Sequence, residues 1–146
     1  MYTFIQKFHS GWAYLVLLFL VLAVLNSLRG MSSKKEFTAS DRKIALLGLI
    51  GAHVQLLVGF ILYFVSPRGY SNIDALGMGE VMKNAVIRLT VIEHPTINII
   101  AIILITIGWS KHKKAATSEA KFKSIAIFYG IGLLLILSRI PWSLWF

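Results

Sequence analysis

Four long runs of apolar residues, separated by shorter polar segments, set the pattern of the chain. They cover residues 11–28, 44–65, 86–109 and 124–145. Each run has roughly the 20 residues that a helix needs to cross a hydrocarbon core of about 30 Å. Because lipid offers no hydrogen-bond partners to a peptide backbone, the runs predict membrane-spanning helices. The expected fold class is all-α: an integral membrane four-helix bundle that forms a single domain over residues 1–146.

The second run carries small residues on one face. Gly48, Ala52, Gln55 and Gly59 follow one another at intervals of four, three and four residues. Small faces let two helix backbones approach closely in lipid, so we expect this face to meet a neighbouring helix. At 100° per residue His53 lies on a different side of the same helix. Short connections between consecutive helices favour an antiparallel arrangement of the bundle.

Composition and charge support this interpretation and add an orientation. The chain is 57% hydrophobic and only 14% charged, whereas soluble domains carry about 25% charged residues. Ten of its fifteen lysines and arginines lie in two segments between the runs, at positions 29, 34, 35, 42, 43, 111, 113, 114, 121 and 123. The positive-inside rule places both segments in the cytoplasm, and both termini with residues 66–85 on the outer, periplasmic side. We therefore expect a multi-pass protein of the inner (cytoplasmic) membrane. The net charge of +9 orients it in the lipid bilayer and predicts no nucleic-acid partner.

Ionisable residues inside the apolar runs are the candidates for function, because such groups are costly in a membrane and face a bundle interior or cavity. His53 lies nine residues into the second run and His94 about eight residues into the third. At 1.5 Å per residue these positions are roughly 14 Å from the cytoplasmic face and roughly 12 Å from the outer face. In a core of about 30 Å the two histidines then lie at nearly the same level. The sequence predicts that His53 and His94 face each other and ligate the iron of haem b.

Further residues predict the outer end of this site. Arg88, Arg139, Trp142 and His9 lie toward the outer side, where the haem propionates would meet them. His9, just before the first helix, is alternatively a spare ligand or a quinone contact. Glu93 lies at a similar level to Arg139, so the two are a possible ion pair that needs no cofactor. A lone intramembrane histidine is also commonly an interhelical hydrogen-bonding residue, and that alternative stays open for each one. The absence of cysteine excludes thiolate ligands and haem of the c type.

Three stretches of the chain carry a family likeness: MYTFIQKFHSGWAYLVLL from Met1, AHVQLLVGFILYFVS from Ala52 and EHPTINIIAIILITIGWSKHKKA from Glu93. Together they resemble the small four-helix, cytochrome b-like membrane proteins of Bacteroidota. The resemblance implies b haem, with matching positions at His9, His53 and His94. A histidine near the head of the first helix is also similar to the membrane-type protoporphyrinogen oxidases. The intramembrane lysine of those oxidases has no counterpart in the third helix here.

These observations predict a b-type haem protein with bis-histidine ligation that transfers electrons, to or from a membrane redox partner or a quinone. No catalytic set of residues is visible, which favours an electron carrier over a stand-alone enzyme. The alternative is a non-catalytic accessory subunit of a larger membrane complex, in which the histidines and the ion pair serve helix packing.

Overall fold

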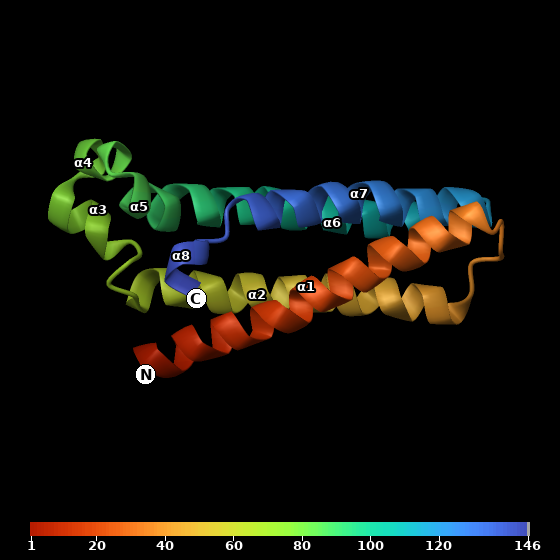
Figure 1. The fold of residues 1–146 in the computed structure, drawn as a ribbon, viewed down its shortest axis with the longest axis horizontal. Coiled ribbons are helices and arrows are strands. Elements are labelled where there is room, and N and C mark those ends of the chain that lie inside the picture. The colour runs from red at the N-terminus through yellow and green to blue at the C-terminus, as the bar shows by residue number, and fades with distance from the viewer. Residues whose placement is uncertain (146) are drawn as a thin grey trace.

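Four long helices pack side by side in the computed structural model, which describes residues 1–145 (Figure 1). They are α1 (Tyr2–Ser32), α2 (Ala39–Val65), the continuous span Ala85–Lys114 and α7 (Ser118–Ser138). The span Ala85–Lys114 is built from α5 (Ala85–Arg88), a π-helical turn η1 (Leu89–Glu93) and α6 (His94–Lys114). All four are long and apolar enough to cross a membrane. The prediction of an all-helical fold is confirmed for the described residues, and the four long helices are compatible with a four-helix membrane bundle.

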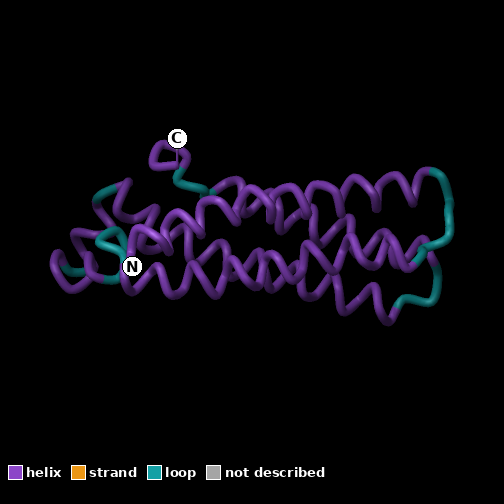
Figure 2. The backbone as a smooth tube through the Cα atoms, turned by 90° about the horizontal axis from the view of Figure 1, so that it is seen from below, coloured by secondary structure: helices purple, strands orange, loops and turns teal. Residues whose placement is uncertain are grey.

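The two ends of the bundle differ in structure (Figures 1 and 2). One end, here called the terminal end, holds the N-terminus, the short helices α3 (Ser71–Leu76) and α4 (Met78–Lys83), and α8 (Trp142–Trp145). The opposite end, here called the loop end, holds the connections from α1 to α2 and from α6 to α7. Helix α1 packs against α2 and α7, and α6 packs closely against α7 but more loosely against α2.

Helix boundaries extend beyond the apolar runs because caps and flanking polar residues continue the helices. At the start of α2, the Thr38 hydroxyl accepts from the Asp41 amide, and the Asp41 carboxylate accepts from the Thr38 amide at 2.8 Å. This capping box satisfies backbone donors that the first helical turn leaves free. Thr38 is thus the N-cap of α2, and Asp41 completes the box from the third helical position.

The fourth apolar run does not form one helix, which corrects the prediction for residues 124–145. Helix α7 ends at Ser138, and α8 begins only at Trp142. Pro141 lies in the break, and a residue before proline is disfavoured in helical geometry. The chain then turns back toward α1 (Figure 1), where the ring of Trp145 lies 4.7 Å from that of Tyr14, centroid to centroid.

The π-helical turn η1 has a local cause. Pro95 has no amide proton, and its ring excludes the carbonyl of the residue four positions before it, which is Val91. The His94 amide accordingly donates to the carbonyl of Leu89, five residues back. The helix widens for one turn immediately before His94.

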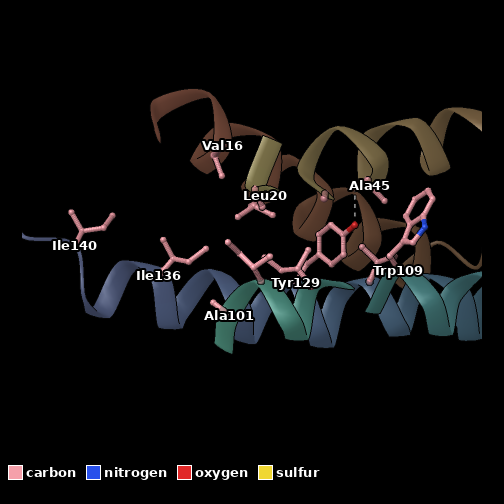
Figure 3. Close-up of a cluster of buried hydrophobic side chains, with 13 residues drawn as sticks. Val16, Leu20, Ala45, Ala101, Trp109, Tyr129, Ile136 and Ile140 are labelled. Atoms are coloured by element: carbon pink, nitrogen blue, oxygen red, sulfur yellow. Dashed lines mark hydrogen bonds between the residues drawn. The ribbon is translucent and has the colours of Figure 1, made fainter. Parts of the chain in front are cut away.

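The core lies between α1, α2, α6 and α7 and contains mostly branched aliphatic side chains (Figure 3). Tyr129 is fully buried there, and its hydroxyl donates to the carbonyl of Ala45 at 2.7 Å. Gly48 allows the close approach of α1, since an added Cβ would lie 3.2 Å from the Leu20 side chain. The small face predicted on α2 is therefore a helix contact, and α1 is the helix that covers it.

Candidate functional site

A cavity of about 460 Å³ opens at the terminal end of the bundle. This volume lies within the range of known ligand and cofactor pockets, about 300–1,000 Å³. Its wall is formed by α1, α2, η1, α6, the end of α7 and the segment containing α8. Most wall residues are apolar, and the polar ones converge from different helices: Tyr2, Gln6, His9, Ser10, Gln55, Tyr63, Ser66, Arg68, Thr90, His94, Thr96 and Asn98.

Two histidines meet in this cavity, and they are His9 and His94. Their ring centroids lie 6.2 Å apart, and the ring planes are nearly perpendicular, at 81°. His9 reaches the cavity because α1 begins at Tyr2, so this residue lies within the helix rather than before it. His94 begins α6 directly after the π-helical turn.

The ring of His94 is oriented by the end of α7. Its Nδ1 lies 2.8 Å from the carbonyl oxygen of Arg139, which can only accept a hydrogen bond, so Nδ1 carries the proton. The Asn98 side-chain amide, 3.2 Å from the same nitrogen, then donates instead to the His94 carbonyl at 2.6 Å. In the neutral ring the lone pair is left on Nε2, which is the arrangement that metal-ligating histidines show.

The ring of His9 lies against α2. Gln55 donates from its side-chain amide to the His9 carbonyl at 2.9 Å, and an added Cβ on Gly59 would lie 3.0 Å from His9 Cε1. Among the residues that the structure describes, two buried side-chain polar atoms have no hydrogen-bond partner, His9 Nδ1 and Gln55 Oε1. Buried polar atoms are nearly always paired in native proteins, so an unpaired set at a cavity points to a missing ligand or water.

His53 is not part of this site, so the prediction that it faces His94 is wrong. Its Nδ1 lies 2.7 Å from the Leu49 carbonyl, and its Nε2 lies 3.3 Å from the hydroxyl of Thr106 on α6. Thr106 is twelve residues beyond His94 on the same helix, which corresponds to about 18 Å along the axis. Because α1 covers the small face of α2, His53 is left exposed on the side of the bundle.

The remaining predicted residues lie outside the cavity wall as the structure describes it: Arg88, Arg139 and Trp142. Glu93 accounts for both arginines, because its carboxylate lies 2.8 Å from Arg88 Nε and 3.5 Å from Arg139 Nε. The predicted pair of Glu93 with Arg139 is thus present, with Arg88 as a second partner. The Trp142 indole donates to the Leu137 carbonyl at 3.2 Å. Because Arg88, Arg139 and Trp142 do not line the cavity, the structure gives no support to their predicted contact with haem propionates.

Sequence reasoning missed two wall residues: Gln55 as a side chain of the site, and Arg68 after the end of α2. Gln55 had a usable signal, since it shares the small face with Gly59 and that face was expected to meet another helix.

No protein-family model, curated protein or solved structure matches the chain.

The side chains that could bind a metal ion limit which ligands this cavity can hold. Within residues 1–145 no group of three or more histidine, aspartate or glutamate side chains is arranged to hold a metal ion. A bare structural metal ion usually takes four protein ligands, whereas this cavity offers two imidazoles. A metal held here would have to bring further ligands of its own. An iron porphyrin does so, because its macrocycle supplies four nitrogens.

Proposed function

We propose that this protein binds one haem b in the cavity at the terminal end, with His9 and His94 as axial ligands, and transfers electrons in the cytoplasmic membrane. The observation that carries the proposal is the meeting of these two imidazoles, from α1 and α6, 6.2 Å apart in one cavity. Two metal–nitrogen bonds of about 2 Å, with about 1 Å from each nitrogen to its ring centre, require roughly the same separation. When bound, haem b supplies a one-electron iron couple.

The rest of the cavity supports the same ligand. The protonated Nδ1 of His94 on the Arg139 carbonyl leaves Nε2 for a metal. Apolar side chains from α1, α2 and α6, such as Val16, Ala52 and Ile102, offer the surface that a porphyrin packs against. In this proposal the site exchanges electrons with a membrane redox partner or a quinone.

The orientation is part of the proposal. We infer that the helices run antiparallel, that the loop end with its ten lysines and arginines faces the cytoplasm, and that both termini face outward. The haem would then lie nearer the outer surface of the membrane.

Absorption spectroscopy of the purified protein tests the proposal. Wild-type protein, extracted in mild detergent and supplemented with haem, should show Soret and alpha bands and a pyridine haemochrome of the b type. His9→Ala and His94→Ala should each weaken or shift these bands, and the double variant should lose them. His53→Ala is the matched control and should keep the wild-type spectrum, because its imidazole lies outside the cavity. Circular dichroism and gel filtration establish that each variant is folded.

A colourless wild-type protein after haem supplementation would refute the haem site. Retention of the wild-type spectrum by the double variant would refute the ligand pair.

The second candidate function is an accessory subunit of a larger membrane complex. It is favoured by the exposed position of His53 beside Thr106, because a polar pair on the outer side of a bundle is suited to contact a neighbouring transmembrane helix. This role predicts that His53→Ala disrupts co-purification with a partner, whereas the variant without His9 and His94 still assembles.

A further inference from the structure

The charge on the cavity wall is concentrated in one residue. Of the wall residues that the structure describes, Arg68 is the only lysine, arginine, aspartate or glutamate. No carboxylate on that wall neutralises it. The cavity therefore combines a largely apolar interior with a single cation that always carries its charge.

Arg68 differs from the other two arginines at the terminal end. Arg88 and Arg139 share the carboxylate of Glu93, at 2.8 and 3.5 Å, whereas Arg68 has no carboxylate of the described residues within ion-pair distance. The Arg68 backbone amide donates to the Ser66 hydroxyl at 3.0 Å, which holds the turn after α2. Within residues 1–145 its guanidinium takes part in no ion pair. It is available to a carboxylate from outside the chain.

The polar wall residues around Arg68 lie at the same end of the cavity. Tyr63 and Ser66 precede it at the end of α2, and Tyr2 begins α1. Apolar side chains such as Val16 and Ile102 lie further along their helices toward the loop end. The one lysine, arginine or carboxylate residue of the described wall thus lies at the terminal end, with polar side chains beside it.

We propose that Arg68 binds the acidic group of the cavity's ligand, so that the site selects an amphipathic molecule with an apolar body and a carboxylate directed toward the terminal end. This inference rests on the proposed haem function and specifies it: the propionates of haem b are the acidic groups, and Arg68 takes the place expected for Arg88 and Arg139. A guanidinium pairs well with a carboxylate because its planar N–H groups match the two oxygens. A neutral quinone could accept a hydrogen bond from the guanidinium but would gain no pairing of opposite charges.

Competitive loading with two porphyrins tests the proposal. The apoprotein, purified in neutral detergent, is titrated with haem b and with haem b dimethyl ester, whose propionates carry no charge. Wild-type protein should prefer the free acid by about fivefold, the size expected for one partly exposed ion pair. Arg68→Gln should abolish that preference, and Arg68→Lys should retain part of it. Arg88→Gln is the control and should leave the preference unchanged, because Arg88 lies off the wall on Glu93.

Two outcomes separate this inference from the proposed function. Tight binding of both porphyrins with equal affinity by wild-type protein would overturn the role of Arg68 and leave the haem site intact. Binding of neither porphyrin would overturn the haem site, and with it the assignment of propionates to Arg68.

Discussion

Replacement of Gly59 by alanine should weaken haem binding without touching either proposed ligand. A Cβ at this position would lie 3.0 Å from His9 Cε1 and 3.5 Å from His9 Nδ1. Carbon atoms prefer separations of about 3.5–4.0 Å, so the imidazole has to move by roughly 0.5–1 Å. Metal–ligand distances tolerate only about 0.2 Å. We therefore expect the haem affinity of Gly59→Ala to fall about 10- to 100-fold, the range seen when a supporting contact of a metal ligand is lost.

Gly130 provides the control for this experiment. It lies within α7, and an added Cβ there meets nothing within 4 Å. Both substitutions remove a helical glycine, so both should gain up to about 1 kcal/mol from reduced backbone freedom in the unfolded state. Haem titration followed at the Soret band should give Gly130→Ala the wild-type affinity. Wild-type affinity in Gly59→Ala as well would refute the argument that α2 holds the His9 ring in register with His94.

Two further predictions concern the core and the ion pairs. Tyr129→Phe should lower the free energy of unfolding by about 0.6–1.7 kcal/mol, the range for interhelical hydrogen bonds in membranes, because the buried bond to the Ala45 carbonyl is lost. Unfolding in mixed micelles measures this, and an effect no larger than that of Tyr14→Phe, at an exposed tyrosine, would contradict it. Glu93→Gln should raise the midpoint potential of bound haem, since removal of a negative charge next to His94 disfavours the oxidised iron. Redox titration measures the potential, and an unchanged value would mean that Glu93 acts only on packing.

The helices were predictable because their length is set by the bilayer and their composition by lipid. The ends of the helices were not predictable from the apolar runs. The length of a run reflects the thickness of the hydrocarbon core, whereas the end of a helix depends on capping hydrogen bonds beyond the run. Helix α2 begins at Ala39, after its cap Thr38 and five residues before the apolar run at Ile44. The break near Pro141 did have a sequence signal, although the hydropathy of the run continues through it.

Of the candidate site, the sequence identified His94 and placed His9 among its contacts, but it chose the wrong partner for His94. The depth argument assumed that each helix begins at the edge of its apolar run and that helices stand level with one another. In the structure α1 starts at Tyr2, which brings His9 into the bundle, and α2 is shifted so that His53 lies beside Thr106. Relative displacement of helices along their axes depends on packing between side chains far apart in the chain. The position of a residue along its own helix therefore does not show which residue of another helix lies at the same level.

The wide turn at Leu89–Glu93 also determines how the chain tolerates changes in length. One residue is accommodated there beyond what a regular α-helix would hold. Deleting a single residue from this turn would let it close up into a regular α-helical turn, so the segments on either side would keep nearly their present facing. The portion from His94 onward could keep its contact with α7, and the segment before the turn would rotate little. A one-residue deletion here should therefore be tolerated, whereas the same deletion within α6 would rotate everything before it by about 100° and turn core-facing side chains out of the bundle.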